Sequence, residues 1–95
     1  MNPVSDSKFK YVYILRSKMN GQWYSGYTSD LRKRLKQHNG GKFKSWTKGR
    51  GPFELIYYEA YRDEHDARAR EMQLKSGLGK RYVRERLRRF LSLTG

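Results

Sequence analysis

Apolar and polar positions change their period several times along the chain, and each change marks a predicted element. Residues 10–16 are β-branched and aromatic side chains in alternation, which is typical of a strand. An Asn20-Gly21 pair follows, and this dipeptide tolerates the positive φ angles of a tight hairpin. Residues 22–27 then form the returning strand. The first part of the chain therefore predicts a β-hairpin.

A helix is predicted directly after the hairpin. Thr28 or Ser29 can cap its N-terminus, and Asp30 is favourable in its first turn. The helix runs to about residue 38, where an Asn-Gly-Gly sequence ends it.

One strand and two helices complete the prediction. Residues 53–61 are mostly apolar, which favours a third strand in the centre of the sheet. Residues 63–76 form a helix that Gly77 ends, and residues 80–93 form the last helix. The order β-β-α-β-α-α predicts an α+β fold, in which helices flank a small three-stranded antiparallel sheet.

The chain is short and contains no cysteine, and both facts limit what it can be. Its 95 residues suffice for one small domain, so we expect a single domain over residues 1–95. No apolar run approaches the roughly 20 residues of a membrane span, and residues 1–10 lack the apolar stretch of a secretory signal. We therefore expect a cytoplasmic protein without a membrane partner.

Charge narrows the class of partner. Lys and Arg number 22 against 9 Asp and Glu, so the formal net charge is +13. Such an excess repels itself unless a polyanion is the working partner. Nucleic acid is the first candidate and an anionic membrane surface the second. The basic residues are spread among Tyr, Trp and Phe along the whole chain, whereas a membrane anchor would more often collect them on one amphipathic helix. A merely soluble basic protein is the remaining alternative.

Several common sites are absent from the sequence. No Cys/His cluster has the spacing of a zinc site, and no glycine loop has the spacing of a phosphate-binding loop. The sequence does not indicate a Ser-His-Asp catalytic set either. We therefore expect no small-molecule cofactor.

One carboxylate interrupts the apolar stripe of the 63–76 helix. The stripe is Ala67, Leu74 and Leu78, and Glu71 falls on the same side, four residues after Ala67. A carboxylate that faces a core is costly unless a positive group compensates it. The compensating group is either an arginine in a salt bridge or a divalent cation, and spacing does not decide between them.

Four other side chains are candidates for a site, each with an ordinary alternative. Tyr13 and Tyr24 lie on paired strands and could face each other, or they could be two core aromatics. Arg34 and His38 share a helix face, with Arg34 expected at the edge of the core and His38 either functional or a surface residue near the cap. Three further cations of this helix form a basic face that could touch phosphates: Arg32, Lys33 and Lys36.

Taken in order, these residues resemble the GIY-YIG nuclease domain. The resemblance rests on Tyr11-Val12-Tyr13, Tyr24-Ser25-Gly26, Arg34 and Glu71, and it extends over a core of about residues 10–78. In layout the chain is similar to the small bacterial UPF0213 group and to the catalytic domain of Slx1-type endonucleases. Tyr11 replaces the first glycine of the family pattern and Ser25 its central aliphatic residue, but the positions of the catalytic side chains are kept.

The resemblance implies a metal-dependent endonuclease that hydrolyses DNA phosphodiester bonds. Glu71 would hold one divalent ion, Mg²⁺ or a relative such as Mn²⁺. Arg34 would pair with the phosphate, and Tyr13, assisted by Tyr24, would orient or deprotonate the attacking water. His38 would either take part in proton transfer or hold a phosphate. The nucleic-acid contacts that we expect are Lys33, Lys36, Lys42, Lys44, Trp46, Lys48 and Arg50.

The resemblance implies the chemistry more specifically than it implies the partner or the substrate. Many relatives carry a separate DNA-targeting domain that this chain lacks, so an unidentified partner protein could supply targeting. Branched or unusual DNA in repair or recombination is the expected substrate, and RNA stays open. The main alternative is a binding module that keeps the fold without catalysis, and docking onto an acidic protein ranks last.

Overall fold

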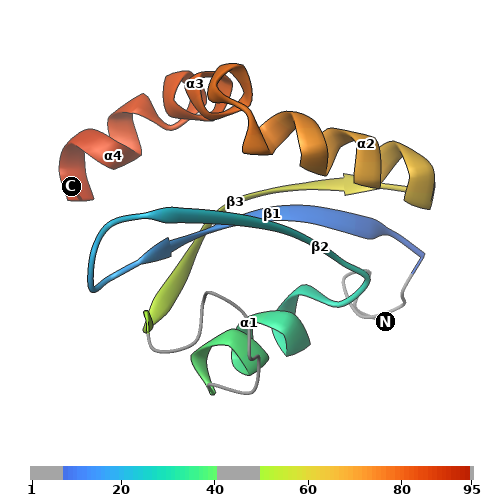
Figure 1. Ribbon diagram of the computed structural model, residues 1–95, viewed down its shortest axis with the longest axis horizontal. Helices are drawn as coiled ribbons and strands as arrows, with labels where there is room; N and C mark the ends of the chain where they lie inside the picture. Colours follow the sequence, from blue (N-terminus) through green and yellow to red (C-terminus); the bar gives the residue numbers. More distant parts are fainter. Residues whose placement is uncertain (1–7, 41–49, 95) are drawn as a thin grey trace.

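The computed structural model describes residues 8–40 and 50–94. Its elements follow the predicted α+β order with one additional helix (Figure 1). They are β1 (Lys10–Ser17), β2 (Trp23–Thr28), α1 (Leu31–Asn39), β3 (Phe53–Tyr61), α2 (Glu64–Lys75), α3 (Gly77–Arg86) and α4 (Arg88–Thr94).

The three strands form an antiparallel sheet in the order β2-β1-β3. The prediction that residues 53–61 form the central strand is therefore wrong, because β1 is central. β1 is almost continuously buried, whereas most residues of β3 are only half-buried. A strand that is covered on both faces must be apolar on both, and here that strand is β1.

The alternation along β1 divides the core between the two faces of the sheet. Val12 and Ile14 pack with buried residues of α2 and α3, namely Ala67, Leu74 and Val83. On the other face, Tyr11 and Tyr13 pack with Leu31 of α1. Figure 1 shows α1 below the sheet and the three later helices above it. The helices thus cover both faces of a thin sheet.

The hairpin turn is longer than the tight turn that Asn20-Gly21 predicts. Ser17 N–H donates to the Gln22 carbonyl at 2.9 Å, so four residues, 18–21, form the loop. Gly21 has a φ of 74°, which is the left-handed conformation that glycine adopts without strain. The loop length fixes the register of the hairpin, which pairs Arg16 with Trp23.

Both ends of α1 are fixed by side-chain hydrogen bonds. Asp30, and not Thr28 or Ser29, is the N-cap, and its carboxylate accepts from Lys33 N–H at 3.1 Å. At the other end, the Asn39 amide exchanges two hydrogen bonds with the backbone of Phe53, at 2.7 and 3.1 Å. The end of α1 is therefore fixed to the start of β3.

The junction between α2 and α3 differs from the predicted helix end. Ser76 ends α2 and also caps α3, and Gly77 begins α3 instead of following a helix. The new helix direction removes Leu78 from the apolar stripe of α2, and its side chain is 76% exposed. The expectation that Leu78 continues that stripe is wrong.

The predicted 80–93 helix is two helices, because the chain bends at Leu87. Leu87 still packs against the core. Phe90 is 37% exposed, with the Arg16 guanidinium 5.3 Å from its ring centroid. The short α4 therefore packs against the end of β1.

A half-buried carboxylate joins α2 to β3. Burial alone would raise the pKa of Glu59, but hydrogen bonds from Arg70, Tyr57 and Tyr61 together lower it to about 2. Arg70 Nε lies 2.8 Å from one carboxylate oxygen, and the Glu59 side chain is only 16% exposed. The ionised carboxylate therefore stabilises the folded state at pH values above its ordinary pKa of 4.5, and this stability is lost as the pH falls toward 2.

We predict that Glu59→Gln lowers the free energy of unfolding at neutral pH by roughly 3 kcal/mol, because Arg70 loses its half-buried partner. The variant should also lose most of the pH dependence of stability between pH 4.5 and 2. Urea unfolding at a series of pH values measures both effects. The control is Glu64→Gln, whose ion pair with Arg68 is half-exposed, so it should cost much less. An unchanged pH profile in Glu59→Gln would contradict this assignment.

Candidate active site

The Tyr13 hydroxyl lies at the centre of the candidate site. Tyr13 is buried on β1 and pairs across the hairpin with Gly26 of β2. Its ring lies over this glycine so closely that a Cβ at position 26 would collide with the ring and the hydroxyl. The absence of a side chain at Gly26 is therefore what leaves room for the Tyr13 phenol.

Tyr24 does not face Tyr13 directly, so that expectation is wrong. Tyr24 pairs with Leu15, because the four-residue hairpin loop sets the register. The two tyrosines are diagonal neighbours on the same face of the sheet. The Tyr24 hydroxyl donates to Gln22 Oε1 at 3.0 Å, and its ring packs edge-on against Phe53. In the described contacts Tyr24 supports the core beside Tyr13.

His38 contacts the Tyr13 hydroxyl from α1. The hydroxyl oxygen lies 3.0 Å from His38 Nε2, and the two rings meet edge to face. Burial and the nearby Arg34 guanidinium lower the pKa of His38 below its ordinary 6.5. The imidazole is therefore neutral at pH 7, and Nε2 can accept the phenolic proton.

The pKa of Tyr13 responds to burial and to two charged neighbours, Arg34 and Glu71. Burial raises it most, the Arg34 charge and a hydrogen bond from Arg34 lower it, and the Glu71 carboxylate raises it, with a net increase above 10. Tyr13 is thus a neutral phenol at pH 7, and its hydroxyl can donate to His38 Nε2 when the imidazole carries its proton on Nδ1. Arg34 thus contacts this hydroxyl through a hydrogen bond, whereas Glu71 acts on it through its charge.

Arg34 is half-buried on α1, one turn before His38, as predicted. It lines a polar pocket of about 300 Å³ with Thr28, Ser29, Asp30, Lys33 and Gln37. Its guanidinium is therefore accessible from one side while it acts on Tyr13 and His38 on the other.

Glu71 comes to the site from α2, across the sheet from α1. It lies about 40° around the helix from the buried Ala67, in the direction of Arg68. Arg68 stacks over Tyr27 of the edge strand β2 at 4.3 Å, so Glu71 is directed toward the same edge. Its side chain is only 18% exposed. This half-buried position agrees with its place on the apolar stripe.

The partner of Glu71 in the structure is Lys75, with 2.9 Å between Nζ and Oε2. The arginine salt bridge considered from the sequence does not occur among the contacts of the described residues. The Lys75 side chain is 50% exposed, and exposed pairs of this kind contribute little to stability. The lysine could therefore move away from the carboxylate at small cost.

The donor set is compatible with an ion that keeps most of its own water. Among residues 8–40 and 50–94, no three His, Cys, Asp or Glu side chains are placed to hold a metal together. This excludes a closed protein cage there. Mg²⁺ is commonly bound by one or two carboxylates with water and substrate phosphate, so Glu71 alone fits it.

The predicted nucleic-acid contacts are only partly covered by the structure. Lys33 and Lys36 are exposed on α1, and Arg50 lines a pocket near the hairpin. Lys42, Lys44, Trp46 and Lys48 lie outside the described residues.

Three residues outside the predicted set line the same pocket as Arg50: Trp23, Lys80 and Arg84. The alternation of side chains along β2 indicates the position of Trp23 from the sequence. Trp23 precedes Tyr24, so the two side chains lie on opposite faces of the sheet.

The match to a family model assigns the chain to a class of nucleases. The chain belongs to the GIY-YIG family: residues 9–88 match the family model described as the GIY-YIG catalytic domain. None of the helices in the described part of the chain has the length and apolarity of a membrane span.

Its relatives include small UPF0213 proteins. The chain is 43% identical over 65 residues to the UPF0213 protein CPE1444 of Clostridium perfringens, which covers 68% of this chain and 69% of that protein. It is also 43% identical over 65 residues to the UPF0213 protein YazA of Bacillus subtilis, covering 68% and 65%. A solution NMR structure of the UPF0213 protein BH0048 from Bacillus halodurans is 38% identical, with a TM-score of 0.49, over 92% of this chain and 86% of that one.

We predict that His38 titrates below pH 6.5 and that Arg34→Gln raises its pKa, because the variant removes a neighbouring positive charge. The change should fall short of the full shift, since burial is the larger cause. NMR titration of the imidazole carbon-bound protons measures both values. Arg32→Gln is the matched control, because Arg32 is an exposed cation on the same helix. A His38 pKa that is equal in both variants would contradict the proximity of Arg34.

Proposed function

We propose that this protein is a metal-dependent endonuclease that hydrolyses DNA phosphodiester bonds, on branched or unusual DNA in repair or recombination. The observation that carries the proposal is the environment of one hydroxyl. Tyr13 is hydrogen-bonded to His38, and the charges of Arg34 and Glu71 both act on it. This combination offers a proton route, a phosphate partner and a carboxylate at one place.

A proton route through Tyr13 is compatible with its pKa, which burial raises. A tyrosinate would be rare at pH 7, so Tyr13 is a poor base by itself. Its oxygen can nevertheless accept a hydrogen bond from water while its own proton is donated to neutral His38. As the water attacks phosphorus, its proton passes to the Tyr13 oxygen and the phenolic proton passes to His38 Nε2. Tyr13 then need not ionise before the reaction.

Arg34 and Glu71 supply the charges of the proposed reaction. Arg34 pairs with the phosphate as negative charge builds on its oxygens. Glu71 would hold Mg²⁺ or Mn²⁺, which when bound supplies Lewis acidity to the phosphate and to the leaving 3′ oxygen. Tyr24 assists by its packing beside Tyr13. The net charge of +13 supports a nucleic-acid partner.

The second candidate function is a nucleic-acid binding module without catalysis. The Glu71–Lys75 ion pair favours it, because a carboxylate that already has a lysine partner needs no metal. This candidate requires salt-sensitive binding that EDTA leaves unchanged and no cleavage product.

We predict that Glu71→Ala abolishes cleavage and that Arg34→Ala lowers its rate by about a hundredfold or more, because each removes charge stabilisation from the transition state. Both variants should bind DNA within a few-fold of the wild type. Cleavage of labelled DNA with Mg²⁺ and binding by fluorescence anisotropy measure the two properties.

The matched control for Glu71 is Glu64→Ala, which removes an exposed carboxylate from the same helix. It should leave the cleavage rate nearly unchanged. Unchanged cleavage by purified Glu71→Ala protein would falsify the proposed mechanism.

We also predict that Gly26→Ala lowers the cleavage rate on the order of a hundredfold, because the new methyl group displaces the Tyr13 hydroxyl from His38. Gly77→Ala is the control, since a Cβ there meets no atom within 4 Å. Circular dichroism establishes that both variants fold. Equal activity of the two glycine variants would show that the position of the Tyr13 phenol does not matter.

A further inference from the structure

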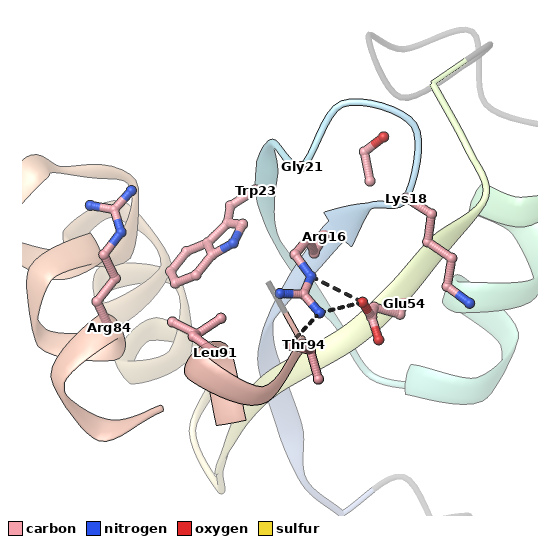
Figure 2. A pocket seen from close by; sticks show the side chains of 9 residues that line it. Arg16, Lys18, Gly21, Trp23, Glu54, Arg84, Leu91 and Thr94 are labelled. Carbon is pink, nitrogen blue, oxygen red and sulfur yellow. Dashed lines mark hydrogen bonds and ion pairs between the residues drawn. The ribbon is translucent and has the colours of Figure 1, made fainter. Parts of the chain in front are cut away.

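Two adjoining pockets lie at the hairpin end of the sheet, away from the Tyr13 hydroxyl. Their volumes are about 660 and 580 Å³, and both are lined by Gly21, Trp23 and Arg84. The larger pocket extends to Leu91 and Thr94 near the end of the chain. Figure 2 shows its lining side chains around the Trp23 ring. The proposed reaction uses neither pocket.

Trp23 presents an aromatic surface between these pockets. It is the first residue of the edge strand β2, and it is half-buried against the core of α2 and α3. The guanidinium of Arg84, an exposed residue of α3, lies 5.2 Å from the indole ring. Figure 2 shows Arg84 beside the indole and Leu91 below it. The ring is thus fixed in place but still borders open space.

The surroundings of Trp23 are strongly basic. Glu54 is the one carboxylate that lines either pocket, and its Oε1 lies 2.6 Å from an Arg16 nitrogen. The bound carboxylate neutralises only one cation. The basic residues that line the two pockets are Arg16, Lys18, Arg50, Lys80 and Arg84. This excess of charge favours a polyanion at the pockets.

The basic pockets and the candidate active site both border the edge strand β2. Tyr24 lines the smaller pocket, and Gly26 lies two residues further along the strand. At about 3.3 Å per residue, Trp23 and Gly26 are separated by about 10 Å. Trp23 lies on the opposite face of the sheet from Tyr13, so a nucleic-acid strand bound at Trp23 would cross the edge strand β2 to reach the Tyr13 hydroxyl.

We propose that the Trp23–Arg84 surface binds an unpaired single strand of the nucleic-acid substrate. One base stacks on the indole, and Arg84, Lys80 and Lys18 contact the flanking phosphates. Stacking on an aromatic side chain needs a base that has left the duplex stack, whereas phosphate contacts alone serve any duplex. An indole held between two basic pockets therefore fits a single strand better than a duplex. This inference rests on the proposed function only for the nucleic-acid class of the substrate.

The test is binding to two DNA probes of equal length in EDTA, so that no cleavage occurs. One probe is an unstructured thymidine oligonucleotide and the other a blunt duplex, each labelled for fluorescence anisotropy. Trp23→Leu should weaken binding of the single strand about tenfold, from the loss of one stacked base, and duplex binding less than twofold. Trp23→Phe keeps an aromatic ring and should restore most of the single-strand affinity.

The contribution of charge to single-strand binding is tested with a second variant, which has its own control. Arg84→Gln should reduce the slope of log affinity against log salt for the single strand by about 0.7, the value for one lost phosphate contact. Arg62→Gln is the matched control, because Arg62 lies beyond Tyr61 at the opposite end of the sheet. It should leave single-strand affinity at the wild-type level apart from the general change in net charge.

Three results would overturn the inference. They are unchanged single-strand affinity in Trp23→Leu, equal weakening for both probes, and equal effects of Arg84→Gln and Arg62→Gln. Because the assay needs no metal, its outcome is separate from the proposed hydrolysis. Trp23-dependent single-strand binding without any cleavage would count against the nuclease proposal alone, and cleavage with Trp23-independent binding would count against this surface alone.

Discussion

The structure depends on the two-residue alternation along β1, the strand that has a neighbour on each side. One set of its side chains, Val12 and Ile14, supplies the core under α2 and α3. The other set includes Tyr13, whose phenol lies under α1. A shift of one residue in register would exchange the two sets, so the same pairing that forms the core also fixes the position of the hydroxyl. Gly26 completes this arrangement because it gives the ring room.

The second constraint on the structure is how this basic protein pairs its few carboxylates. Glu59 and Glu54 are bound to arginines in half-buried pairs, and Asp30 and Asp63 cap helices. These groups maintain the structure. Glu71 differs because it is half-buried at the sheet edge while its partner is a lysine that is half-exposed. A lysine is a flexible point charge without the planar fork of arginine, so this pair is the easiest of these to rearrange around a ligand.

Local patterns in the sequence predicted the order of the elements apart from the break at Leu87, and they singled out Glu71, but they did not predict the arrangement in space. The stripe of α2 identified Glu71, because a carboxylate among apolar positions is visible without a structure. The sequence could not show that Tyr24 pairs with Leu15, since loop length rather than strand composition sets the register. Leu78 was misplaced because Ser76 ends one helix and caps the next. Apolar content made β3 seem central, although its tyrosines pack from an edge.

The proposed hydrolysis depends on a phenol, an imidazole, a guanidinium and a carboxylate that act together. It also needs a bound metal ion. The most direct test incubates the purified wild-type protein with labelled flaps, forks, junctions and plain duplex DNA, each with Mg²⁺ and with EDTA. The proposed nuclease should release products from at least one branched structure with Mg²⁺ and none with EDTA. Salt-sensitive binding to every probe without any product, or cleavage that persists in EDTA, would contradict it.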